Sequence, residues 1–168
     1  MDLNIRKIQI NDPEIIFNAF KAQGWNKPLE QYNCYIKEQK NNIRITLIAE
    51  LNGEFAGYTT IKWNSSYEYF IKNKIPEISD LNVLIKFRQM GIGNKLLDKA
   101  EDIIKNYSDY AGIGVGLFSD YGVAQRLYVK RGYIPDGKGI YKNDSYIKYN
   151  ETVIIDDDVV LYFIKLLK

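Results

Sequence analysis

The sequence contains no histidine and only one cysteine among its 168 residues. The absence of histidine excludes Ser-His-Asp and Cys-His nucleophile pairs, His-ligated zinc or non-haem iron, and an imidazole that titrates near neutral pH. The single cysteine, Cys34, can close no internal disulfide and can build no thiolate metal cluster. We therefore predict no metal site, a reducing cytoplasmic location, and a general base other than histidine.

An excess of one charge and long apolar runs are also missing. Lys and Arg number 23 against 21 Asp and Glu, a formal net charge of +2, which is too small for the phosphate neutralisation that nucleic-acid binding requires. The longest apolar run, residues 159–164, is far shorter than the roughly 20 residues of a membrane-spanning helix, and the first residues hold no signal-peptide pattern. We expect a soluble, unprocessed protein with neither a nucleic-acid nor a membrane partner.

Length and composition predict one globular domain over residues 1–168. Hydrophobic residues make up 46% and charged residues 26% of the chain, the balance of an ordinary soluble domain. A chain of this length buries roughly 70% of its unfolded surface around one core. The four prolines are scattered, and no repeat or linker interrupts the sequence.

Local patterns predict helices and strands that alternate in the middle of the chain. Asn52-Gly53 favours the tight turn of an antiparallel hairpin, and apolar residues recur at helical spacing after Gly91. Strands alternating with helices, flanked by hairpins, predict a mixed α/β domain. The expected elements are helices over residues 11–24, after Pro28, over 91–106 and over 122–131, and strands on both sides of the turn within 43–62, over 75–83, over 111–118 and over 159–164.

The strand expected over residues 75–83 has a fault in its alternation. Ile75 is in phase with Leu81 and Val83, but Ile78 falls between the expected positions. An inserted bulge residue produces this pattern, and bulges re-aim a side chain or an amide next to functional sites. We predict a bulge at Ile78.

The strand expected over residues 111–118 alternates glycine with apolar residues. Three apolar side chains then share one face, and bare backbone forms the other. Some group must approach the bare face closely. A packed helix is favoured over a ligand, and both interpretations stay open.

Residues 88–93 read Arg-Gln-Met-Gly-Ile-Gly and lie between an expected strand and an expected helix. Glycines let backbone approach a ligand, and a helix N-terminus offers unpaired N–H groups and a positive dipole end, so a phosphate or pyrophosphate suits this segment. Two known phosphate-binding motifs do not match this segment. A P-loop needs Gly-Lys-Ser/Thr where Gly93 is followed by Asn94-Lys95, and the dinucleotide fingerprint needs a third small residue where Leu96 stands.

The run Arg-x-x-Gly-x-Gly after a faulted strand resembles the pyrophosphate loop of the GNAT superfamily of acetyl-CoA-dependent N-acetyltransferases. Residues 124–133, Ala-Gln-Arg-Leu-Tyr-Val-Lys-Arg-Gly-Tyr, resemble the family's Ala-x-x-Leu-Tyr-x-x-x-Gly-Phe/Tyr element. The resemblance covers roughly residues 43–135. It implies an α/β fold of the α+β type: a mixed, mostly antiparallel central sheet with a splayed pair of parallel strands, flanked by helices. One position departs, because Tyr121 stands where the family often has Asn.

The resemblance also implies where acetyl-CoA, as a cosubstrate, would bind. Backbone groups of Leu81, Asn82 and Val83 would pair with the pantetheine arm. The arm would lie in a slot left where the glycine-rich strand diverges from the strand expected over residues 75–83. Amides of the loop and the following helix would hold the pyrophosphate, with Arg88 adding charge. The implied binding residues are Leu81, Asn82, Val83, Arg88, Gln89, Met90, Gly91, Ile92, Gly93 and Asn94.

Two catalytic residues follow from the same resemblance. Tyr128 would donate a proton or hydrogen bond to the departing sulfur; the alternative is a packed helix aromatic. Glu77, six residues before Val83, matches the general-base glutamate of one branch of the family. Its alternative is an exposed carboxylate at a strand end. Asp80 competes with Glu77 and water for the role of base, although alternation puts it on the opposite face.

The acceptor is implied only as a class. We expect a primary amine, of a small molecule rather than a protein, because the sequence shows no strongly acidic groove for a basic peptide. A protein N-terminus or lysine, and a non-catalytic acyl-CoA sensor, are the alternatives. The sequence leaves a homodimer open.

Overall fold

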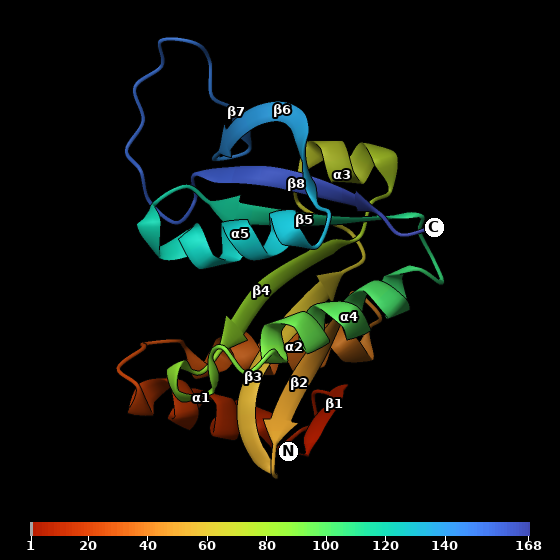
Figure 1. The fold of residues 1–168 in the computed structure, drawn as a ribbon, viewed down its shortest axis with the longest axis vertical. Coiled ribbons are helices and arrows are strands. Elements are labelled where there is room, and N and C mark those ends of the chain that lie inside the picture. The colour runs from red at the N-terminus through yellow and green to blue at the C-terminus, as the bar shows by residue number, and fades with distance from the viewer. Residues whose placement is uncertain (1) are drawn as a thin grey trace. The chain divides into compact units, whose positions relative to one another are not determined.

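The computed structural model describes residues 2–168, and its contacts divide the chain into two compact units. Unit 1 comprises residues 2–63 and 78–103, and unit 2 comprises residues 64–77 and 104–168. Figure 1 shows the helices and strands of both units. Within residues 2–168, no helix is both long and apolar enough to cross a membrane.

Unit 1 is built on four neighbouring strands in the order β1-β2-β3-β4, of which β1–β2 and β2–β3 pair in antiparallel fashion. The β2–β3 turn confirms the hairpin prediction: Asn52 and Gly53 both have positive φ, 51° and 82°, as a tight hairpin turn requires. The elements of this unit are β1 (Leu3–Lys7), α1 (Asp12–Ala22), α2 (Leu29–Lys40), β2 (Arg44–Leu51), β3 (Glu54–Lys62), nearly all of β4 (Glu77–Val83), η1 (Ile85–Phe87) and nearly all of α4 (Ile92–Ile104).

The core of unit 1 packs α1 and α2 against β2 and β3. Phe20 of α1 lies edge-on to Tyr58 of β3, with ring centroids 5.9 Å apart, and Tyr32 of α2 lies edge-on to the same ring at 5.7 Å. All three side chains are fully buried. Edge-to-face aromatic packing of this kind fixes ring orientation as well as burying area. The two helices are therefore held firmly over the sheet.

Unit 2 contains four strands in the order β5-β8-β6-β7, all paired in antiparallel fashion. A buried aromatic cluster of tyrosines and Phe70 packs α3 against β6 and β8. The elements are α3 (Glu68–Asn73), β5 (Tyr110–Gly116), η2 (Ser119–Tyr121), α5 (Gly122–Lys130), β6 (Ile134–Lys142), β7 (Ser145–Tyr146) and β8 (Val160–Leu166).

Aromatic side chains fill the bare face of the glycine-rich strand β5. A Cβ on Gly112 would lie 2.2 Å from the ring of Phe70 in α3, and one on Gly116 would lie 2.5 Å from the ring of Tyr121 in η2. Gly114 is covered in the same way by Tyr162 of β8, at 2.9 Å. The packed-helix interpretation is confirmed at Gly112.

A methyl group at Gly112 should destabilise the protein, because Phe70 is itself fully buried and has no room to move. We expect Gly112→Ala to lower the free energy of unfolding by about 1–3 kcal/mol, the usual range for overpacking. Gly122→Ala is the matched control, since no atom lies within 4 Å of a Cβ there and alanine favours a helix start. Thermal unfolding of both variants checks this; equal melting temperatures would contradict it.

The structure corrects the predicted bulge in β4. Ile78 is a fully buried core residue, and the irregular residue is Asp80, whose φ is 59° in an otherwise extended strand. A left-handed residue shifts the phase of the side chains around it, so the break in alternation showed that a fault exists but misplaced it by two residues. The helices α1, α2, α4 and α5 and the strands β2, β3, β5 and β8 are confirmed, whereas β1, α3, β6 and β7 were not predicted.

Candidate functional site

Residues 88–94 in unit 1, a loop together with the first turn of α4 and called the loop of residues 88–94 below, have the backbone shape of an anion site. Gln89 and Gly91 both have left-handed φ values, 63° and 81°. The Gly91 carbonyl accepts a hydrogen bond from the Lys95 N–H at 3.1 Å, so α4 starts directly at this turn. The first N–H groups of a helix have no acceptor within the helix, and they point out of its N-terminal end. The loop can therefore present several backbone donors to one anion.

Helix α4 is anchored by a continuous apolar face, which fixes the position of this N-terminus. The residues of that face recur at helical spacing and are fully buried: Ile92, Leu96, Leu97, Ala100 and Ile104. Burying five such side chains stabilises the docked helix by several kcal/mol, at about 25 cal/mol per Å² of apolar surface. The donors of the loop are thus carried on a rigid support.

Arg88 lies exposed at the start of the loop and is held locally. Its guanidinium stacks over the ring of Trp25 with 5.4 Å to the centroid, and its Nε donates to the Val83 carbonyl at 3.4 Å. A cation over an indole face is a favourable contact that keeps its charge exposed to solvent. The positive charge therefore stays beside the loop, as the implied role requires.

Tyr128, in α5 of unit 2, is almost completely buried. Burial raises the pKa of its phenol well above the ordinary value, and Tyr121 raises it further. The group is therefore a neutral O–H donor at any working pH. Its backbone carbonyl accepts the Tyr133 N–H at 3.0 Å, where Gly132, with φ 86°, turns the chain back against α5.

Glu77 is a buried carboxylate at the start of β4, not an exposed one at a strand end. It is 6% exposed, and Ser65 Oγ donates a hydrogen bond to its Oε2 at 2.6 Å. Ser65 Oγ in turn accepts the Tyr67 N–H at 2.9 Å. These contacts fix the carboxylate within unit 2. Its role as a base remains a prediction.

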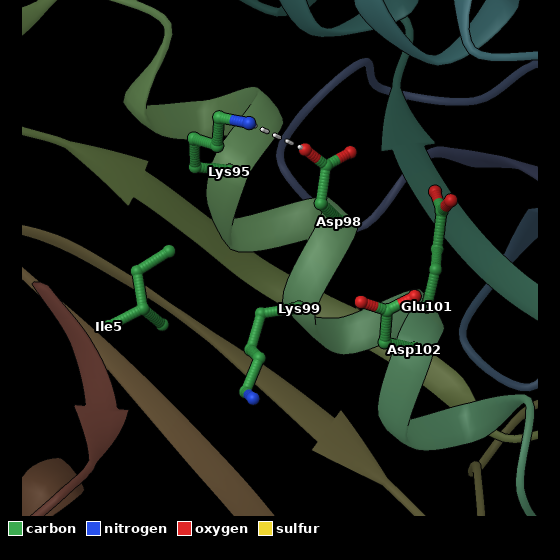
Figure 2. Close-up of a pocket in the computed structure, with 6 residues that line it drawn as sticks. All are labelled: Ile5, Lys95, Asp98, Lys99, Glu101 and Asp102. Carbon is green, nitrogen blue, oxygen red and sulfur yellow. Dashed lines mark ion pairs between the residues drawn. The ribbon is translucent and has the colours of Figure 1, made fainter. Parts of the chain in front are cut away.

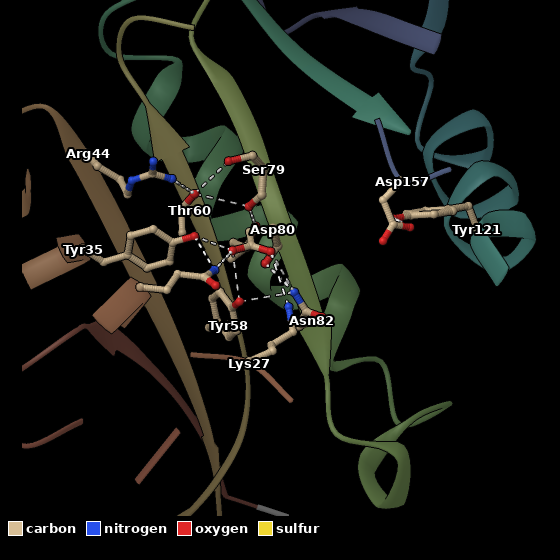
Figure 3. Close-up of polar contacts among 12 residues, drawn as sticks. Lys27, Tyr35, Arg44, Tyr58, Thr60, Ser79, Asp80, Asn82, Tyr121 and Asp157 are labelled. Carbon is tan, nitrogen blue, oxygen red and sulfur yellow. Dashed lines mark hydrogen bonds and ion pairs between the residues drawn. The ribbon is translucent and has the colours of Figure 1, made fainter. Parts of the chain in front are cut away.

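Tyr121, the position that departs from the family pattern, serves the packing of unit 2. Its ring covers Gly116 and lies edge-on to Phe118, with centroids 5.1 Å apart. Its hydroxyl donates to Asp157 Oδ1 at 3.0 Å, as Figure 3 shows. The tyrosine therefore connects β5 to the segment that leads into β8.

The predicted cofactor residues all lie in unit 1, where residues 81–83 end β4 and residues 88–94 form the loop before α4 and its first turn. The two predicted catalytic residues, Glu77 and Tyr128, both belong to unit 2. Sequence reasoning missed the polar cluster around Asp80, shown in Figure 3. The signal was available, because an aspartate inside a strand goes against β-propensity.

A pocket of about 510 Å³ lies on unit 1 beside α4, and none of the predicted cofactor or catalytic residues lines it. Figure 2 shows its charged walls, in which Lys95 and Asp98 form an ion pair with 3.5 Å between Nζ and Oδ2. Small-molecule sites are mostly apolar with a few polar groups, which this surface is not. Its lining is Ile5, Lys95, Asp98, Lys99, Glu101 and Asp102. Over the part of the chain that is described, no group of three or more Asp, Glu, Cys or His side chains is arranged to hold a metal ion.

Residues 10–133 match a family model described as the acetyltransferase (GNAT) family. A 54-residue segment is 41% identical to an uncharacterized N-acetyltransferase of Archaeoglobus fulgidus. That segment spans 32% of this chain and 36% of the relative's length.

Solved structures are similar over nearly the whole chain. An N-acetyltransferase from Staphylococcus aureus Mu50 has a TM-score of 0.73 at 15% identity, with 100% of both chains covered. A candidate acetyltransferase from Salmonella typhimurium, solved with its cofactor acetyl-CoA, has a TM-score of 0.71 at 15% identity, covering 100% of this chain and 95% of that one. The predicted fold class, a mixed, mostly antiparallel GNAT-like sheet with flanking helices, is confirmed by these likenesses.

Two further similar structures are of enzymes named for different amine substrates. A spermidine N-acetyltransferase chimera from Vibrio cholerae and hSSAT has a TM-score of 0.71 at 14% identity, covering 99% of this chain and 96% of that one. A ribosomal-protein-alanine N-acetyltransferase from Brucella melitensis has a TM-score of 0.69 at 18% identity, covering 97% and 99%. At these identities the likeness establishes the fold alone.

Proposed function

The chain belongs to the acetyltransferase (GNAT) family, and from this premise we propose that it transfers an acetyl group from acetyl-CoA to a primary amine of a small molecule. The loop of residues 88–94 is the observation that carries the proposal. Its two left-handed residues and the buried helix behind it form a rigid set of backbone donors. A pyrophosphate is the anion that such a set suits.

The residues of unit 1 fit acetyl-CoA as a substrate. Gly91 has open space on the side where a Cβ would lie, with no heavy atom within 4 Å of that point. Arg88 adds a positive charge at the start of the loop. The backbone of residues 81–83 would pair with the amide-rich pantetheine arm in the manner of an added strand.

Acetyl transfer needs a neutral amine. An amine with a pKa near 10.4 is neutral in only about one molecule in a few thousand at pH 7. The nitrogen attacks the thioester carbonyl carbon, the C–N bond forms, the C–S bond breaks, and the ammonium proton leaves to a base. We assign Glu77, directly or through water, as that base. The buried Tyr128 hydroxyl donates a hydrogen bond to the departing thiolate, or a proton that solvent then replaces, and the Val83 N–H stabilises the developing charge on the carbonyl oxygen.

A small-molecule acceptor is proposed over a protein because an enzyme for a basic peptide is expected to carry an excess of acidic residues, whereas this chain carries a net charge of +2. The similar structures include enzymes for a polyamine and for a protein alanine. Both kinds of acceptor are amines that carry a positive charge before the reaction.

A thiol-release assay over a panel of acceptors tests the proposal. The panel comprises polyamines, aminoglycosides, simple primary amines, and peptides with a free N-terminus or a lysine. Release with small amines is the expected result. Release with peptides alone would replace the small-molecule acceptor with a protein. Tight binding of CoA by calorimetry without release for any acceptor would support an acyl-CoA sensor instead.

A further inference from the structure

Asp80 has an unusual backbone conformation for a strand residue. It lies inside β4, yet its φ is 59°, in the left-handed region. Residues with a Cβ are disfavoured there, although aspartate tolerates this region better than most. Such a conformation persists only where the surroundings hold it, and residues of this kind gather at functional sites.

The Asp80 carboxylate is held from three elements of unit 1, which Figure 3 shows converging on it. Its Oδ2 accepts hydrogen bonds from the Tyr35 hydroxyl at 2.5 Å and the Gln31 side-chain amide at 2.8 Å, both on α2. The Tyr58 hydroxyl of β3 donates to the same oxygen at 3.0 Å. Oδ1 accepts the side-chain amide of Asn82 at 3.2 Å. Hydrogen bonds to a charged acceptor are the strong ones.

The donors around Asp80 keep their protons at every working pH. Tyr58 is fully buried, and burial raises its pKa well above the ordinary value. Burial and the charge of Asp80 also raise the pKa of Tyr35. The Lys27 ammonium lies 3.7 Å from Oδ1 and adds an opposite charge. With three donors on Oδ2, this carboxylate is arranged as a tie between elements and not as an acceptor of a substrate proton.

The strand that follows Asp80 runs unusually close to β3. A Cβ on Gly57 would lie 2.4 Å from the carbonyl oxygen of Asn82 and 3.0 Å from the Cα of Val83. Only glycine fits such a contact between backbones. The left-handed residue is therefore followed closely by a segment, residues 82 and 83, whose backbone packs directly against that of Gly57.

We propose that Asp80 is a positioning residue: its carboxylate, tied to α2 and β3, fixes the left-handed turn in β4 and so directs the backbone N–H and C=O groups of residues 81–83 toward acyl-CoA. This role rests on the proposed function, which assigns those backbone groups to the pantetheine arm. The hydrogen bonds of Asp80 then explain the irregularity of β4. They also connect helix α2 to the part of β4, residues 81–83, that is assigned to acyl-CoA.

Three variants of the full chain test the role. Asp80→Gly keeps the freedom to adopt a positive φ but loses the tie. Asp80→Asn keeps one acceptor oxygen, and Tyr35→Phe removes a single donor. Glu50→Gln is the control, because Glu50 is a β2 carboxylate of unit 1 that accepts hydrogen bonds from Arg6 and Asn4 of β1, away from β4. The measurements are the Kd of acetyl-CoA by calorimetry and hydrogen exchange of the amides of residues 81–83.

Asp80→Gly should weaken acetyl-CoA binding about 10- to 100-fold, the scale of losing one or two backbone hydrogen bonds to the ligand. The amides of residues 81–83 should exchange faster while those of unit 2 stay unchanged. Asp80→Asn and Tyr35→Phe should show smaller losses of about 3- to 10-fold, in the same direction. Glu50→Gln should bind acetyl-CoA like the parent protein.

Normal affinity and normal exchange at residues 81–83 in a folded Asp80→Gly variant would overturn the role. If that variant does not fold, Asp80→Asn and Tyr35→Phe decide in the same way. Loss of a limb of the pH–rate profile in Asp80→Asn would also overturn it, because a proton acceptor and not a tie would then have been removed. Failure of the parent protein to bind acetyl-CoA overturns the proposed function itself, which the parent measurement reveals before any variant is compared.

Discussion

Replacing Gly91 with valine is expected to weaken acetyl-CoA binding by at least about 10²-fold. Gly91 has φ 81°, a conformation that a β-branched residue avoids, so the loop must rearrange. Rearrangement takes the backbone donors out of alignment. Losing two amide hydrogen bonds to a charged phosphate, at about 1.5 kcal/mol each, costs about 3 kcal/mol, which corresponds to this factor. Isothermal calorimetry with acetyl-CoA measures it directly.

Gly53→Val is the matched control for that experiment. Gly53 has φ 82° and, like Gly91, no heavy atom within 4 Å of a Cβ, and both belong to unit 1. The two substitutions therefore impose a similar backbone strain, but only one lies in the loop of residues 88–94. Equal losses of affinity in both variants would mean that strain on unit 1, and not the shape of this loop, controls binding.

The motif and its local structure were predictable from the sequence because both depend on short-range chemistry. Gly91 and Gly93 mark a close approach of backbone, and the apolar spacing after them specifies the buried face of α4. The Asn52-Gly53 turn is equally local, since its two positive φ values depend on its own residues. Helix α4 and the β2–β3 turn were therefore predicted at the positions where the structure has them.

The surroundings of the site were not predictable because they depend on contacts between distant segments. The left-handed φ of Asp80 is supported by Tyr35 and Gln31, more than 40 residues earlier in the chain. The burial of Glu77 depends on Ser65, from a loop with no strong pattern. Short or weakly patterned elements such as α3 and β7 are defined mainly by the aromatic cluster of unit 2. Periodicity within one segment does not carry this information.

The hydroxyl of Tyr128 distinguishes a catalytic role for this residue from a role in packing. A packing role needs only the ring, whereas donation to a departing sulfur needs the hydroxyl and its proton. Burial raises the pKa of Tyr128, so the proton is present throughout the range in which amines are acetylated. The donation is therefore available at alkaline pH, where the neutral fraction of the acceptor amine is largest. The rate should rise with pH without a descending limb from this phenol.

Tyr128→Phe is expected to lower kcat by up to about 10²-fold while the Kd of acetyl-CoA stays within about twofold of the parent value. A thiol with a pKa near 8.5 needs only modest help to leave, which limits the size of the effect. Steady-state kinetics and calorimetry on the same preparation separate the two quantities. Tyr133→Phe is the control, because Tyr133 is a buried neighbour whose ring centroid lies 6.1 Å from that of Tyr128 and the family element accepts Phe there. If kcat were equal in the parent and Tyr128→Phe, the hydroxyl would have no part in the reaction and the ring would be a packing group.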